Sequence, residues 1–441
     1  MAENVDLLIE PRWIAQVQPE TLLTRHAVAV RDGRIVDILP AGPARARYRA
    51  AEHVALPDHL LIPGLINLHT HAAMALMRGL ADDLPLMDWL QRHIWPAEAA
   101  NVSEDFVRDG TRLACSEMLL GGITTFNDMY FFPAAAAEAA TALGMRAVLG
   151  ITTLEFPTAY ASDADDYLNK GLAAREAWLD HPLVSFCLAP HAPYTVGDAT
   201  FSRVLTLAEQ LQLPVHCHIH ETRDEIAGSQ TAHGCRPLAR LQRLNLLGPN
   251  LIGVHAVHLD PDEIALLARQ GCSVAHCPTS NLKLASGIAP VAALLAAGVN
   301  VGLGTDGAAS NNRLDLFQEM RLAALLAKGT SGDAAALPAR QALRMATFNG
   351  ALALGLDKRL GSIEIGKAAD LCAVDLGGIG KLPCFDPISH LVYAAGREDV
   401  SHVWVDGKCC VSSNKLCAAG ENDLKNSVSL WQNRLEIRPG A

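Results

Sequence analysis

The sequence has no uninterrupted apolar run of about eighteen residues, the length that a membrane-spanning helix requires. Its start, MAENVDLLIEPRW, has no basic stretch followed by an apolar one, which disfavours a secretory signal. Basic residues are outnumbered, with 36 Lys and Arg against 47 Asp and Glu and a net charge of −11. Because a net negative surface repels polyanions, we expect neither a nucleic-acid partner nor a membrane partner.

Cysteine pairs with the spacing of a disulfide framework or a thiolate metal site are also absent. The eleven cysteines are odd in number, and most lie singly in apolar runs such as SFCL. Buried free thiols are typical of a reducing compartment, so we expect a cytoplasmic protein. Cys409, Cys410 and Cys417 gather in a polar segment, which we expect to affect packing or an interface and not catalysis.

Half of the 441 residues are apolar and 19% are charged, which favours a large folded core over disorder. Eight short apolar runs end in polar or turn residues, and stretches with helical spacing separate most of them. Eight alternating strand–helix units in about 250 residues predict a closed (β/α)8 TIM barrel. A doubly wound open sheet is the alternative, but no Gly-rich phosphate turn follows the first run. The runs are 61–71, 121–129, 146–156, 184–195, 214–222, 251–259, 272–281 and 299–310.

Both ends of the chain have a different pattern, with short alternating strands and turns such as VAVRDGRIVDIL and HVWVDGKCCV. We expect them to form one small β-sandwich domain beside the barrel. The predicted boundaries are 1–60 for its first half, 61–358 for the barrel, and 359–441 for its second half with a terminal helix. In that helix one face is apolar and should dock on the body; it carries Leu424, Val428, Trp431 and Leu435.

The most informative motif is His69-Thr70-His71, which closes the first run. Side chains alternate along a strand, so His69 and His71 point the same way. Two imidazoles at the end of a buried strand can ligate one divalent metal ion, although a single His-x-His is a weak signal.

Three later runs end in matching polar side chains. Three histidines and an aspartate can bind Zn²⁺ and leave a position for a water whose pKa the metal lowers. Fe²⁺ and Mn²⁺ also suit nitrogen and oxygen ligands. Glu221 is placed to take a proton from that water and return it. The side chains are His216, His218, His220 and Glu221 in the fifth run, His255 and His258 in the sixth, and Asp306 in the eighth.

Each of these residues also has an ordinary structural explanation. A single histidine in an apolar strand is more often a hydrogen-bonded core residue, and Asp306 could be a turn residue or a helix cap. Their joint occurrence at four strand ends is harder to explain by packing, because burying unpaired polar groups is costly. The combination therefore predicts a metal site at the carboxyl ends of the strands.

Long segments of the chain resemble the metal-dependent deaminases of the amidohydrolase superfamily, and most of all those that act on 5′-methylthioadenosine and S-adenosylhomocysteine. The matching segments span the barrel, and GSIEIGKAADL extends the resemblance into the small domain. The resemblance implies hydrolytic deamination of these nucleosides or adenosine to an inosine-type product and ammonia, by a homo-oligomer. The barrel segments are PGLINLHTHAAMALMRGLADDLPLMDWLQRHIWPAE, APHAPYT, HCHIHET, VHAVHL, HCPTSNLKLASG and GLGTDGAASNN.

The same resemblance implies one divalent ion per subunit, foremost Zn²⁺. Relatives with two metals bridge them by a modified lysine at the end of the fourth strand, where this chain has Pro190-His191-Ala192-Pro193. A site for a single metal ion follows. Its implied ligands are His69, His71, His218 and Asp306.

For catalysis, the resemblance implies that Glu221 shuttles protons, that His255 polarises the attacking hydroxide, and that Asp306 shares in proton transfer. Glu221 and Asp306 also contact the substrate, Glu98 binds the ribose hydroxyls, and His191 lies near the ribose or the leaving group. His216 and His220 have no implied role and are expected to be structural.

Several alternatives stay open at this point. A related hydrolase of guanine, cytosine or a triazine would share the barrel chemistry, and a noncatalytic scaffold would not need the shuttle carboxylate Glu221. A polynucleotide deaminase is excluded because the His-x-Glu…Pro-Cys-x-x-Cys pattern is missing. The segment 74–89 could hold a thioether or simply pack as a loop. Arg78 and Arg146 could bind a substrate carboxylate, but we expect both to form ion pairs at the surface.

Overall fold

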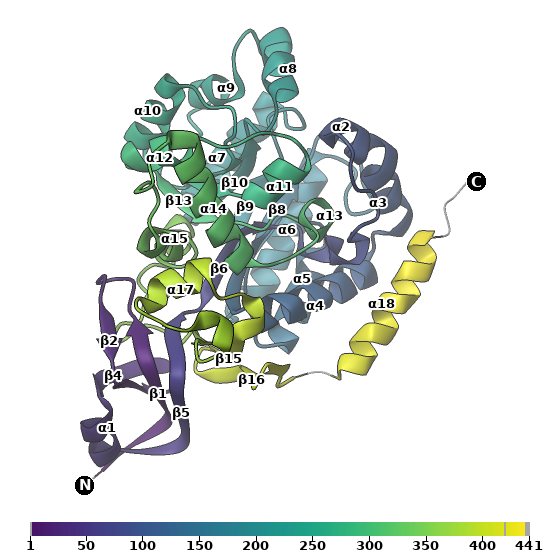
Figure 1. Ribbon diagram of the computed structural model, residues 1–441. Helices are drawn as coiled ribbons and strands as arrows, with labels where there is room; N and C mark the ends of the chain where they lie inside the picture. The colour runs from purple at the N-terminus through teal and green to yellow at the C-terminus, as the bar shows by residue number, and fades with distance from the viewer. Residues whose placement is uncertain (1, 419, 437–441) are drawn as a thin grey trace.

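The structure, a computed structural model, describes residues 2–418 and 420–436. Eight parallel strands follow one another around the barrel in chain order, and each lies within one of the eight apolar runs (Figure 1). The predicted TIM barrel is therefore confirmed. The strands are β6 (Leu65–Thr70), β7 (Ile123–Asp128), β8 (Arg146–Thr153), β9 (Val184–Pro190), β10 (Val215–Ile219), β11 (Leu251–His255), β12 (Ser273–His276) and β13 (Asn300–Leu303).

Helices connect the strands and cover the outside of the barrel (Figure 1). Many begin at capping residues; Asp260, for example, accepts a hydrogen bond from the backbone N–H of Glu263 at the start of α10. The helices are α4 (Glu104–Leu120), α5 (Pro133–Ala142), α6 (Ala164–Trp178), α7 (Asp198–Leu211), α8 (Arg223–His233), α9 (Pro237–Arg243), α10 (Pro261–Gln270), α11 (Pro278–Lys283), α12 (Val291–Ala296), α13 (Ala308–Asn311), α14 (Leu316–Ser331), α15 (Ala339–Met345) and α16 (Phe348–Ala353). Short helical turns after β6 are η1 (Ala72–Met77), α2 (Leu86–Trp89), η2 (Leu90–Ile94) and α3 (Trp95–Asn101). No helix in the described part of the chain is long and apolar enough to cross a bilayer.

Hydrogen bonds join the first barrel strand, β6, to the residues that directly follow the last one, β13. The Asn67 amide donates to Thr305 Oγ1 at 2.8 Å, and the Thr305 N–H donates back to Asn67 Oδ1 at 2.9 Å. One residue further on, the Asp306 N–H donates to the carbonyl oxygen of His69 at 3.0 Å. This seam holds two of the predicted metal ligands side by side, although 237 residues separate them in the chain.

The two ends of the chain meet in one nine-stranded sheet, in the order β17-β16-β15-β14-β5-β1-β3-β4, with β2 on β1. The joining pair is β5 with β14, for example Leu61 opposite Ala373. This confirms a small β-domain built from both termini. Its elements are β1 (Glu3–Ala15), β2 (Leu22–Thr24), β3 (His26–Arg31), β4 (Arg34–Pro40), α1 (Ala41–Arg47), β5 (Tyr48–Pro63), β14 (Leu371–Asp375), η3 (Ile379–Lys381), α17 (Pro387–Tyr393), η4 (Arg397–Asp399), β15 (Val400–Val405), β16 (Lys408–Ser412) and β17 (Lys415–Leu416). The domain boundaries at 60/61 and 358/359 stay a prediction.

The terminal helix α18 (Glu421–Glu436) docks on α4 along the predicted face. Leu424 and Trp431 are buried, whereas Val428 and Leu435 are half-buried. The Trp431 ring packs edge-on against Phe106, and its indole N–H donates to Asp109 at 2.7 Å. The preceding cysteine segment forms the strands β16 and β17. Cys409 in β16 and Cys417, directly after β17, have their sulfur atoms 3.6 Å apart.

A buried ion pair joins the barrel to the small domain. Arg146, the first residue of β8, donates from Nε and Nη2 to both carboxylate oxygens of Asp370, each at 3.0 Å. Only 3% of Arg146 and 6% of Asp370 are exposed, so the expectation of a surface ion pair is wrong for Arg146. Because Arg146 lies at the end of its strand opposite to the predicted site, it is not a substrate ligand.

Arg146→Met is expected to lower the free energy of unfolding by about 3–5 kcal/mol, because it leaves the buried Asp370 carboxylate without its partner. Urea unfolding followed by circular dichroism measures the change. Arg108→Met, which removes an exposed pair with Glu138, should leave the unfolding free energy nearly unchanged. Equal midpoints for both variants would show that the Arg146 pair contributes little.

Candidate metal centre and active-site cavity

The residues predicted to act in the site gather at the carboxyl ends of the barrel strands. His69 lies in β6 and His71 directly follows it, while His218 lies in β10 and His255 ends β11. Asp306 lies just beyond β13. The period-two argument holds for His69 and His71, whose ring centroids lie 4.8 Å apart.

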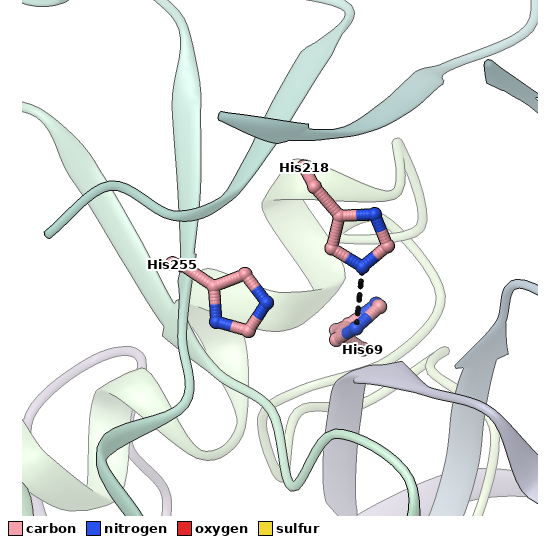
Figure 2. Close-up of side chains that lie close together, drawn as sticks. All are labelled: His69, His218 and His255. Atoms are coloured by element: carbon pink, nitrogen blue, oxygen red, sulfur yellow. Dashed lines mark hydrogen bonds between the residues drawn. The ribbon is translucent and has the colours of Figure 1, made fainter. Parts of the chain in front are cut away.

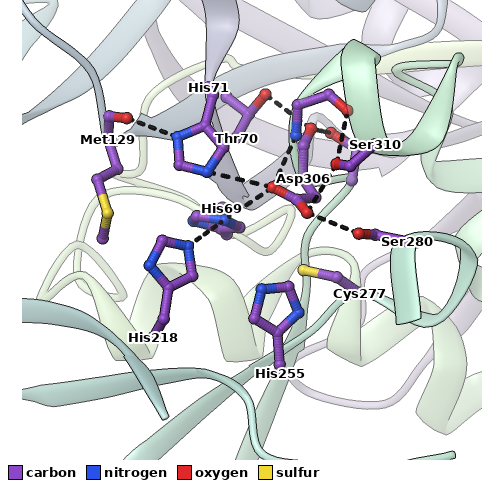
Figure 3. Close-up of polar contacts among 12 residues, drawn as sticks. His69, Thr70, His71, Met129, His218, His255, Cys277, Ser280, Asp306 and Ser310 are labelled. Carbon is purple, nitrogen blue, oxygen red and sulfur yellow. Dashed lines mark hydrogen bonds and ion pairs between the residues drawn. The ribbon is translucent and has the colours of Figure 1, made fainter. Parts of the chain in front are cut away.

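The ring nitrogens converge on one carboxylate oxygen (Figure 3). Nε2 of His69 lies 3.1 Å and Nε2 of His71 lies 3.3 Å from Asp306 Oδ1. Nε2 of His218 lies 3.3 Å from Nε2 of His69. The ligand atoms of His69, His71 and Asp306 lie within 4.8 Å of one another, as do those of His69, His218 and His255 (Figure 2). The structure thus brings all four predicted ligands together, with His255 beside them.

Two backbone carbonyl oxygens show that Nδ1 of His71 and Nδ1 of His218 carry a hydrogen. Nδ1 of His71 lies 2.6 Å from the Met129 carbonyl oxygen, and Nδ1 of His218 lies 2.7 Å from that of His191. Since a carbonyl oxygen only accepts, each Nδ1 must donate, so the Nε2 atoms are the ones that face the cluster. Nε2 atoms and a carboxylate oxygen that converge on one point form a donor set that fits a metal cation.

The charges of the cluster support the same conclusion. Burial lowers the pKa of His69 to about 4 and that of His218 well below its usual range, so both rings are neutral, as metal ligation requires. Burial also lowers the pKa of His71, but Asp306 outweighs it and raises that pKa to about 9. Although burial favours the neutral acid, His69 and His71 hold the pKa of Asp306 well below its usual range. The carboxylate therefore draws positive charge into this corner of the site.

Asp306 is held by contacts that the sequence did not reveal. Its Oδ2 accepts hydrogen bonds from Ser280 at 2.6 Å and Ser310 at 2.8 Å, and its Oδ1 accepts one from the Gly307 N–H at 2.8 Å. Both serines lie in segments that resemble the family, HCPTSN and GTDGAAS, but nothing in their spacing shows that they meet at one carboxylate. His216, expected to be structural, also contacts the site, since its Nε2 lies 3.0 Å from Nδ1 of His69.

Glu221 and His255 lie beside the cluster. Oε2 of Glu221 lies 3.9 Å from Nε2 of His255, whose Nδ1 lies 2.9 Å from the Asn281 side-chain oxygen. Burial raises the pKa of Glu221 above its usual range. A buried carboxyl group with a raised pKa is suited to accept a proton and give it back.

A cavity of about 360 Å³ opens onto the cluster and is mostly apolar. Glu98 and His191 line it, as do His71, Glu221 and Asp306. Glu98 accepts a hydrogen bond from the Tyr130 hydroxyl at 2.7 Å, and burial raises its pKa to about 7. For His191, burial lowers the pKa to about 3 and keeps the ring neutral.

Part of the segment 74–89 forms a wall of this cavity. Met74, Leu86 and Trp89 line it, whereas Met77 packs in the core and Leu84 does not reach it. Arg78 does not face the cavity either. It pairs with Glu117, so neither arginine that the sequence left open meets the site.

A sequence model described as "Amidohydrolase family" matches residues 60–410. The chain is 48% identical to a 5-methylthioadenosine/S-adenosylhomocysteine deaminase of Saccharophagus degradans, over 98% of this chain and 97% of the relative. It is 47% identical to the protein of the same name in Teredinibacter turnerae, over 98% of both.

Solved structures agree with these sequence matches. A crystal structure of an adenosine deaminase from Xanthomonas campestris with bound zinc has a TM-score of 0.98 and 49% identity, covering 99% of this chain and 100% of that one. A zinc complex of atrazine chlorohydrolase from Arthrobacter aurescens has a TM-score of 0.90 at 25% identity, covering 97% and 100%. With the family model matching most of its length and relatives matching nearly all of it, the chain belongs to the amidohydrolase family.

Proposed function

We propose that the protein is a zinc-dependent aminohydrolase that deaminates adenosine derivatives, namely 5′-methylthioadenosine, S-adenosylhomocysteine or adenosine. The observation that carries the proposal is the convergence of His69, His71, His218 and Asp306 beside a cavity that Glu98 and Glu221 also line. Relatives at 47–48% identity bear the name of this activity. The reaction adds water at C6 of the purine, breaks the bond from C6 to the amino nitrogen and releases ammonia.

The four convergent side chains would hold the metal ion. When bound, a zinc ion lowers the pKa of a water ligand toward neutrality and so supplies a hydroxide nucleophile at neutral pH. The Nε2 atoms of the neutral His69 and His218 rings and the ionised Asp306 suit Zn²⁺, which binds nitrogen and oxygen ligands, and the ion would take the place of the His71 Nε2 proton.

The proton transfers are assigned to the side chains beside the cluster. Glu221 takes a proton from the attacking water and delivers it to the purine nitrogen next to C6, which makes C6 more electrophilic. Nε2 of His255 accepts a hydrogen bond from the attacking water and orients it, because its Nδ1–H is held by Asn281. Asp306 shares in passing the proton to the amino group, which leaves as ammonia.

Two further side chains are assigned to the substrate. Glu98 accepts hydrogen bonds from the ribose hydroxyls, since its second carboxylate oxygen is free of the Tyr130 bond. His191, neutral and in the cavity wall, contacts the ribose or the leaving group. Both residues lie on the wall shared with His71 and Glu221, so one nucleoside can contact all four.

Ammonia release from a panel of substrates tests the proposal. The zinc-loaded protein is offered 5′-methylthioadenosine, S-adenosylhomocysteine, adenosine and guanine, and chloride release from a chlorotriazine is followed in parallel. We expect turnover of adenosine derivatives and none of guanine or the triazine. If no adenosine derivative releases ammonia while zinc is bound, the substrate is another heterocycle.

Within this panel, 5′-methylthioadenosine is expected to have a kcat/KM about 10–100-fold above that of S-adenosylhomocysteine. In the described residues, no lysine or arginine lines the cavity of about 360 Å³. Arg240, at the neighbouring cavity, is already bound to Asp198 and to the carbonyl oxygen of Val196. A buried charged tail without a partner costs about 1–3 kcal/mol, which corresponds to this ratio.

5′-Butylthioadenosine, which is long but uncharged, separates the effect of charge from that of length. It should be turned over nearly as well as the methylthio compound. If the kcat/KM for S-adenosylhomocysteine equals that for both thioethers, the charged tail must reach solvent or a cation outside this cavity.

We also propose that the protein acts in the cytoplasm as a homo-oligomer with no nucleic-acid partner. Its cysteines are free thiols throughout the described residues, and its net charge is −11. Sedimentation velocity at micromolar concentration tests the oligomeric state. A single species at the monomer mass of 47.0 kDa would contradict it.

A further inference from the structure

A buried glutamate outside the metal cluster accepts hydrogen bonds from the turn that carries Glu221. Glu225 is 8% exposed and lies in the first turn of α8, three residues after the cap Thr222. Its Oε1 accepts the N–H of His220 at 3.1 Å, and its Oε2 accepts the N–H of Glu221 at 2.8 Å. One side chain therefore binds the backbone amides of two of the three residues between β10 and α8.

This arrangement differs from ordinary helix capping. In a capping box, the glutamate at this position accepts the N–H of the cap residue itself, as Glu263 does for Asp260 at 3.0 Å in α10. Glu225 instead accepts the N–H groups of the two residues that precede Thr222. Its carboxylate is thus used to hold the loop and not to complete the cap.

The turn needs such support. His220 has a φ of 50°, in the left-handed region that is unfavourable for residues other than glycine. The Glu221 carboxylate itself is loosely held, because its one hydrogen bond within the described residues is a 3.5 Å contact from Ser286. The direction of the Glu221 side chain therefore depends on its backbone, and the backbone depends on Glu225.

We propose that Glu225 is a positioning residue that sets the direction of the Glu221 carboxylate through two backbone hydrogen bonds. This inference rests on the proposed role of Glu221 as proton shuttle. Proton transfer requires the carboxylate within hydrogen-bond reach of both the water and the purine nitrogen, and small misplacements of a catalytic group lower rates strongly.

The test is a double-mutant cycle in kcat for 5′-methylthioadenosine. Glu225→Gln is nearly the same size but replaces one acceptor oxygen by an NH₂ group that opposes a backbone N–H. It should lower kcat by about 10–100-fold with KM and zinc content unchanged. In a Glu221→Gln background the same change should lower kcat less than about twofold, because residues that act as one unit are not additive.

Asp399→Asn is the matched control, because Asp399 also accepts a backbone N–H, that of Gly396 at 3.0 Å, in the first turn of a helix but far from the barrel mouth. It should leave kcat unchanged. Equal losses from Glu225→Gln in both backgrounds, or loss of zinc or of the folded state, would assign Glu225 a general structural role and overturn the inference. Full activity of Glu225→Gln would overturn it as well. If Glu221→Gln alone leaves turnover intact, it is the proposed shuttle that fails.

Discussion

Glu221→Gln is expected to lower kcat for deamination by about 10²–10⁴-fold while zinc stays bound, because an amide cannot take a proton from water and pass it to the purine ring. KM should change little, since the amide keeps the size and hydrogen-bonding capacity of the side chain. Steady-state kinetics on 5′-methylthioadenosine and the zinc content of the same preparation measure both effects.

Glu263→Gln provides the matched control for that change. Glu263 is a buried glutamate, 8% exposed against 5% for Glu221, but it lines neither cavity and pairs with Arg236. The kcat of the Glu263→Gln variant should stay near that of the unchanged protein. Should both variants fall alike, the loss would reflect removal of any buried carboxylate and not a proton shuttle.

The second large effect is expected from Asp306→Ala. Removing the Asp306 carboxylate, on which His69 and His71 converge, takes away the negative charge that attracts a cation. We expect zinc to be lost on dialysis and activity to fall by more than about 100-fold, the upper end of the effect of residues that merely hold a ligand. Elemental analysis of the dialysed protein gives the zinc content.

Ser280→Ala gives an intermediate case for comparison. It keeps the carboxylate but removes the 2.6 Å hydrogen bond to Oδ2, so zinc affinity or activity should fall by about 10–100-fold. An Asp306→Ala protein that retains one zinc ion per chain after dialysis would contradict the assigned ligand set.

Local patterns in the chain were sufficient to predict the barrel and the residues at its mouth. The eight apolar runs each contain one barrel strand, because alternation and run length depend on neighbouring residues. His69 and His71 share a face for the same reason. The places of Glu98 and His191 in the cavity wall followed from the family resemblance alone, and their roles remain proposals.

Other features depended on contacts between residues far apart in the chain. Ser280 and Ser310 meet at Asp306, and His216 meets His69, only because the barrel closes. Arg146 turned out to join the two domains, and Glu225 to hold the turn of Glu221, although either could have been a surface charge by sequence.

The sequence by itself determined the strand–helix periodicity, the side of each strand that carries chemistry and the identity of the polar groups at the strand ends. These properties follow from backbone geometry over two to four residues. Only the tertiary structure decided which ring nitrogens converge on Asp306 and which hydroxyls donate hydrogen bonds to it. It also decided that the Glu225 side chain binds the backbone of Glu221. Hydrogen bonds depend on donor–acceptor distances of about 3 Å, and such distances between distant segments are set by barrel closure and packing, not by local pattern.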